Sequence, residues 1–102
     1  MTVNLDRASE LISPEIMAIV RKQPYNLQGW KILDRWASQE PETLTGLQNR
    51  GLLIFINVLL SQQKDESDAL SSQLGDNHLS EMEKLQIAGI DTTLAQRLNL
   101  WN

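Results

Sequence analysis

The sequence predicts an all-α fold, a compact bundle of five or six short helices around one central apolar helix. Three observations support this prediction. Apolar residues recur at spacings of three and four along much of the chain. Residues that favour helix starts stand before several of these stretches. One block, residues 52–60, is apolar around most of a helical circumference.

Length and composition indicate one globular domain, covering residues 1–102. The chain has 41% hydrophobic and 22% charged residues, and it contains no cysteine for a disulfide or a sulfur-ligated zinc site. Residues 1–10 lack the apolar stretch of a secretory signal, and residues 52–60 are far fewer than the ~20 needed to cross a bilayer. We therefore expect a cytoplasmic protein without a membrane segment.

The charge distribution favours a protein partner over a nonspecific DNA partner. The net charge is −4, and the whole excess lies in residues 51–102, which hold three basic and seven acidic residues. Residues 1–50 hold six of each kind. Because DNA attracts proteins mainly through Lys and Arg, an acidic half is poorly suited to a nonspecific DNA contact.

The first half of the chain predicts a short helical turn and two helices. The turn covers about residues 4–12. The next helix starts at Ser13 and Pro14, since serine caps helices and proline is tolerated at the first helical position, and it stops at Pro24. A further helix is expected over residues 27–38, where apolar residues recur at helical spacing.

The central helix is expected over residues 41–63. Its polar side chains fall into one narrow stripe, and apolar residues occupy far more than the ~100° arc expected of a surface helix. We therefore expect Phe55 and Leu59 in the core, with the tryptophans of the preceding helix packed against them. Since so wide an apolar surface is hard to bury in this short chain, part of it is expected to contact another subunit. The candidate partner surface consists of Leu53, Ile56 and Leu60.

Two further helices are expected beyond a charged run, residues 64–68, which either continues the central helix or turns the chain. Ser80 and Glu83 match a capping box, which predicts a helix over residues 81–88 that ends at Gly89. Asp91 or Thr92 is expected to cap the last helix. The buried face expected for that helix consists of Leu94, Ala95, Leu98 and Trp101.

The residue inventory indicates no catalytic or metal site. His78 is the only histidine and lies in a polar turn, where exposure to solvent is the ordinary outcome. Acidic pairs such as Asp65 with Asp68, and Glu81 with Glu83, are typical of solvated helix faces and lack EF-hand spacing. No phosphate-binding glycine loop or nucleophile elbow is found. We therefore expect no enzymatic activity, no cofactor and no metal.

The segment at residues 85–98 resembles a helix-hairpin-helix unit, placed within about residues 80–101. Gly89, Ile90, Ala95 and Leu98 match positions of that family. The resemblance implies two short helices joined by a hairpin whose backbone amides hold a nucleic-acid phosphate. Asp91 replaces the second glycine of the hairpin, and its carboxylate would repel a phosphate. The packing part of the motif is therefore retained better than its binding part.

A basic cluster beside Trp30 and Trp36 gives nucleic-acid binding a second set of candidate residues. Such side chains either contact phosphates or cover the rims of buried tryptophans. Together with the hairpin, the candidate nucleic-acid contacts are Gly89, Ile90, Arg97, Arg21, Lys22, Lys31 and Arg35.

The expected function is that of a small non-catalytic protein-interaction or regulatory module, such as an assembly subunit, an adaptor or an inhibitor or immunity-type protein. Its partner would be another protein or a second copy of itself. The alternative is a nucleic-acid-binding regulator that uses the helix-hairpin-helix-like unit.

Overall fold

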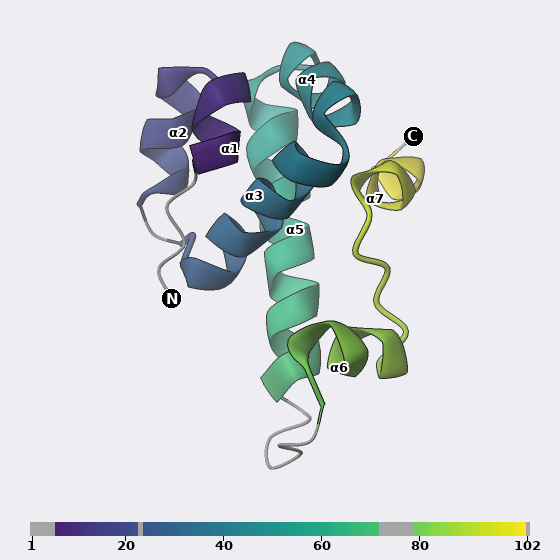
Figure 1. The fold of residues 1–102 in the computed structure, drawn as a ribbon. Coiled ribbons are helices and arrows are strands. Elements are labelled where there is room, and N and C mark those ends of the chain that lie inside the picture. Colours follow the sequence, from purple (N-terminus) through teal and green to yellow (C-terminus); the bar gives the residue numbers. More distant parts are fainter. Residues whose placement is uncertain (1–5, 23, 72–78, 102) are drawn as a thin grey trace.

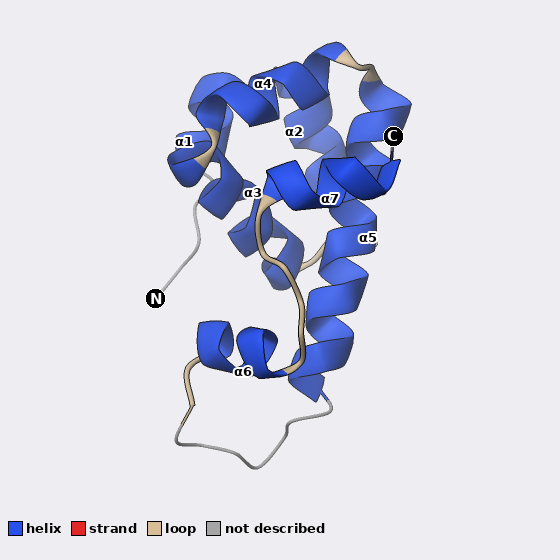
Figure 2. Cartoon of the chain, turned by 90° about the vertical axis from the view of Figure 1, so that its right-hand side faces the viewer, coloured by secondary structure: helices blue, strands red, loops and turns tan. Residues whose placement is uncertain are grey.

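The chain folds as an all-α structure, which confirms the predicted fold class. The computed structural model describes residues 6–22, 24–71 and 79–101, and within these ranges it contains seven helices and no strand (Figures 1 and 2). The helices are α1 (Asp6–Leu11), α2 (Pro14–Val20), α3 (Leu27–Gln39), α4 (Pro41–Asn49), α5 (Leu52–Ser71), α6 (Glu81–Ile87) and α7 (Leu94–Trp101). His78 and the side chain of Trp101 lie outside the described part.

Several helices begin where local sequence signals place them. The Ser13 hydroxyl accepts a hydrogen bond from the Ile16 amide, with Pro14 at the first position of α2. The Asn26 side chain accepts from the Gln28 amide at the start of α3. At α6 the predicted capping box is present, with both hydrogen bonds between Ser80 and Glu83.

The prediction of a single helix over residues 41–63 is wrong, because the helix is interrupted at Gly51. This residue has φ +112°, a conformation that side chains disfavour, and it separates α4 from α5. The Gly51 amide donates to the carbonyl of Gln48 as α4 ends, and its carbonyl accepts from Phe55 as α5 begins. The charged run at residues 64–68 continues α5, which reaches Ser71.

Helix α5 lies at the centre and packs against α2, α3, α4, α6 and α7, while α1 packs on α3 (Figure 1). Phe55 and Leu59 are fully buried, as predicted. Trp36 is also fully buried, and Trp30 is partly buried against the core. The core therefore forms where α3 and α5 meet, with the other helices around them.

A close approach of α3 to α5 explains a glycine inside a helix. A Cβ atom on Gly29 would lie 2.1 Å from Oε1 of Gln63. The buried Gln63 side chain accepts from the Asn26 amide and donates to the carbonyl of Pro24, so it joins α5 to the start of α3. Gly29 leaves room for this buried amide group.

Candidate functional site

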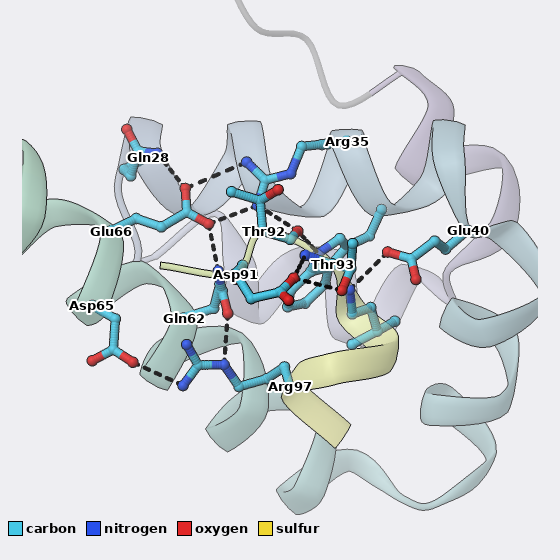
Figure 3. A network of polar contacts seen from close by, with 12 residues as sticks. Gln28, Arg35, Glu40, Gln62, Asp65, Glu66, Asp91, Thr92, Thr93 and Arg97 are labelled. Carbon is cyan, nitrogen blue, oxygen red and sulfur yellow. Dashed lines mark hydrogen bonds and ion pairs between the residues drawn. The ribbon is translucent and has the colours of Figure 1, made fainter. Parts of the chain in front are cut away.

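A buried polar network lies where α3, α5 and the C-terminal segment meet (Figure 3). Its centre is Glu66, which is fully buried on α5. Nη2 of Arg35 lies 2.6 Å from one carboxylate oxygen of Glu66, and Nη1 lies 3.3 Å from the other. Gln28 and Gln62 also donate to this carboxylate, at 3.0 Å and 2.6 Å. The buried charge is therefore paired and hydrogen-bonded, as burial of a carboxylate requires.

The same side chains hold the loop before α7. Arg35 and the indole N–H of Trp36 both donate to the carbonyl of Thr92, at 3.0 Å and 3.1 Å. Gln62 donates to the carbonyl of Asp91 at 2.9 Å and accepts from Nε of Arg97 at 2.6 Å. Side-chain donors thus satisfy the carbonyls of Asp91 and Thr92 in this loop.

The start of α7 differs from the prediction that Asp91 or Thr92 caps it. Thr93 occupies the capping position, and its hydroxyl lies 3.4 Å from the Gln96 amide that donates to it. The Glu40 carboxylate accepts from the amides of Leu94 and Ala95, at 2.7 Å and 3.1 Å. A residue distant in sequence therefore satisfies the amides that helix starts leave unpaired.

Asp91 positions the capping threonine instead. Its carboxylate accepts from the amide of Thr93 at 2.9 Å and from the Thr93 hydroxyl at 2.7 Å. These two bonds, the amide bond first, hold the pKa of Asp91 below its usual value, and the positive charge of Arg97 acts in the same direction.

The buried face predicted for the last helix is partly wrong. Leu94 and Leu98 are buried, but Ala95 is exposed, because its side of the helix faces away from the core. Helices α6 and α7 each pack on α5, and both views show them apart, joined by an extended loop (Figures 1 and 2).

The hairpin amides are engaged within the fold. The Gly89 amide donates to the carbonyl of Gln86, and the Ile90 amide donates to that of Leu85 at 2.9 Å. With Gly89 at φ +78°, this is a Schellman ending of α6. These two amides are therefore not available to hold a phosphate in this conformation.

Of the seven candidate nucleic-acid residues, Gly89, Ile90 and Arg97 line one hollow, together with the carboxylates of Asp65 and Asp91, and the other four lie elsewhere. Lys31 forms an ion pair with Glu81 at 2.8 Å, and Arg97 forms one with Asp65 at 2.8 Å. Arg35 belongs to the buried network. Arg21 and Lys22 are exposed at the end of α2. The sequence showed these charges but not their carboxylate partners, which come from other helices.

The candidate partner surface is only partly exposed. Leu53 is 69% exposed, whereas Ile56 and Leu60 are partly buried against the core. Leu52 and Ile54, which were not among the predicted surface residues, are 36% and 38% exposed. We call the three consecutive residues Leu52, Leu53 and Ile54 the α5 apolar end. The glycine before them was the one sequence signal that a helix starts here.

The described ranges contain no group of three His, Cys, Asp or Glu residues placed to hold a metal ion. In those ranges no helix is long and apolar enough to span a membrane. No family model, curated protein or solved structure matches this chain.

Proposed function

We propose that this chain is a small non-catalytic protein-interaction module that contacts another protein, or a second copy of itself, through the α5 apolar end. The observation that carries the proposal is the exposure of three consecutive large apolar side chains, with Leu53 at 69%. Burying a leucine side chain yields about 1.5–3 kcal/mol, so covering this end would favour association. We place the module in the cytoplasm as part of the same proposal.

The backbone of α5 supports this role because it holds the three side chains in fixed positions. The carbonyl of Gly51 accepts the first bond of the helix from Phe55. The Asn57 side chain donates to the carbonyl of Leu53 at 2.8 Å, one turn away. Since Phe55 is fully buried, the start of α5 is anchored in the core. A surface fixed in this way loses little conformational entropy when a partner binds.

The polar network supports a structural role rather than a catalytic one. The carboxylate of Glu66 and the guanidinium groups of Arg35 and Arg97 are all bonded to other groups of the fold. General acid–base chemistry instead needs a titrating group within reach of a substrate. The network is better suited to holding the C-terminal segment in place.

The nucleic-acid alternative has less support. The amides of Gly89 and Ile90 are bonded to α6, and three of the five candidate cations are paired with carboxylates. Binding of a phosphate by the amides of Gly89 and Ile90 would have to break the Schellman ending.

Photo-crosslinking in the native host tests the proposal. A benzophenone amino acid is placed at position 53, and in a matched control at position 38, where Ser38 is exposed on α3. We expect a discrete crosslinked product from position 53 alone, and its loss when Ile54→Asp is added. A product at twice the mass of the chain would identify a second copy as the partner. No product at position 53, or equal products from both positions, would contradict the proposal.

A further inference from the structure

A hollow of about 480 Å³ lies on the α1–α2 side of the molecule. Ile12 and Met17, which are 4% and 6% exposed, form its floor. Its rim consists of residues that are all exposed, namely Ser9, Pro14, Ala18, Arg21 and Lys22. The hollow thus has an apolar floor and two positive charges at one end.

The fold holds both helices that shape this hollow. At the turn from α1 to α2, the Ser13 amide donates to the side chain of Gln48 on α4 at 2.7 Å. At the far end of α2, the indole N–H of Trp30 donates to the carbonyl of Val20 at 2.8 Å. Because α2 is bonded at both ends, the fold itself sets the shape of the hollow.

The two cations at the hollow differ from the other candidate cations in their ion pairing. Lys31, Arg35 and Arg97 each pair with a carboxylate. Arg21 and Lys22 form no ion pair with any residue that the structure describes, although the chain is acidic overall. Glu15 stands at the opposite end of α2, so the charge along this helix runs from negative to positive. An occupant would therefore place its negative group beside Arg21 and Lys22.

The exposure of the rim indicates the size of that occupant. Small-molecule sites enclose most of their ligand, whereas only the floor of this hollow is buried. A large apolar side chain fits on the floor while the chain that carries it runs outside. This geometry fits a segment of a protein better than a free metabolite.

We propose that the hollow docks a short acidic peptide segment of another protein. One large apolar side chain of the segment packs on Ile12 and Met17, and a neighbouring carboxylate lies beside Arg21 and Lys22. This contact is separate from the α5 apolar end and does not depend on it.

Fluorescence anisotropy with labelled synthetic peptides tests the proposal on the full chain. The probes carry one Leu or Phe a few positions from two Glu residues, and matched probes carry Lys in place of Glu. We expect the acidic probes alone to bind, with an affinity that falls as salt is added. Lys22→Glu should weaken binding by about fivefold, because it replaces an exposed attractive charge pair by a repulsive one. Ala18→Glu, which places a carboxylate in the hollow, should abolish it.

The matched control is Lys64→Glu, which makes the same charge change at an exposed site on α5. Equal weakening by Lys22→Glu and Lys64→Glu would overturn the proposal, because only the net charge would then matter. Absence of binding by every acidic probe would overturn it as well, as would laurate binding at the hollow without peptide binding. Leu53→Glu should leave peptide binding unchanged, so this test is independent of the crosslinking experiment.

Discussion

Tyr25 is the only tyrosine of the chain, and it lies in the α2–α3 connection with its side chain buried against α5. Its hydroxyl donates to the carbonyl of Ile56. Burial raises the pKa of Tyr25 from 10.0 to about 12, because a phenolate would lose its contact with water there. The side chain therefore stays neutral in the folded protein at a pH where it ionises in the unfolded chain.

This difference predicts a loss of stability at high pH. As pH rises from 10.0 to about 12, the unfolded chain releases the tyrosine proton while the folded chain retains it, so the free energy of unfolding falls. The loss should approach about 2–3 kcal/mol. Tyr25→Phe should lack this part of the decline, at a cost of about 1 kcal/mol at neutral pH. Urea unfolding of both proteins from neutral to alkaline pH measures the two effects, and stability curves that stay parallel above pH 10.0 would contradict the assignment.

The pair of Arg35 and Glu66 predicts a strong dependence of each residue on the other. Glu66→Leu should lower the free energy of unfolding by about 3–5 kcal/mol, because it leaves the largely buried guanidinium group without a counter-charge. The double variant Arg35→Met, Glu66→Leu should recover much of that loss. Urea titrations of Arg35→Met, Glu66→Leu and the double variant give a double-mutant cycle, which measures the coupling between the two side chains. Additive losses would show that the two side chains act independently.

At the scale of elements, replacement of two glycines in the α4–α5 region by alanine should have opposite effects on stability. Gly51 has φ +112°, so Gly51→Ala should destabilise the protein by about 1–3 kcal/mol. Gly46 lies inside α4, where an added Cβ atom would meet nothing within 4 Å, and Gly46→Ala should stabilise by about 0.5–1 kcal/mol. Thermal unfolding followed by circular dichroism compares the two variants. A rise of both midpoints would mean that the helix is not broken at Gly51.

The helices that the sequence predicted correctly are those whose signals are local. Ser13 and the Ser80–Glu83 box act within one turn, so neighbouring residues are enough to recognise them. The break at Gly51 was missed because apolar spacing continues through it, so the glycine was the one local signal, and the structure shows its effect in the backbone angle. The cap of α7 was missed for another reason, since Glu40 lies 54 positions before Leu94.

At the scale of the whole molecule, the apolar residues of α5 should differ in how much they contribute to stability. Phe55 is fully buried, so Phe55→Ala should cost about 3–5 kcal/mol through the cavity it leaves. Leu53 is 69% exposed, so Leu53→Ala should change the stability of the monomer by no more than about 0.5 kcal/mol. Urea midpoints of dilute samples test the contrast. A costly Leu53→Ala would place that residue in the core.

The sequence predicted an excess of apolar surface on α5 but not where it would be exposed. Which residues stay uncovered depends on how other helices pack, and that packing covers Ile56 and Leu60 in part while it leaves Leu52 and Ile54 open. The pairing of Lys31 with Glu81 was hidden for the same reason, because the two residues lie 50 positions apart. Contacts between residues far apart in the sequence therefore determine which candidate site residues are exposed and unpaired.

Four of the bonds that fix the C-terminal segment, made by Glu40, Arg35 and Trp36, join residues 54 to 57 positions apart. Closing a loop of that length costs about 3.5 kcal/mol of chain entropy, whereas a helical turn forms within neighbouring residues. These contacts should therefore form late in folding. Weakening them, as in Glu40→Gln, should accelerate unfolding more than it slows refolding, which places residues 88–101 among the first parts of the molecule to open.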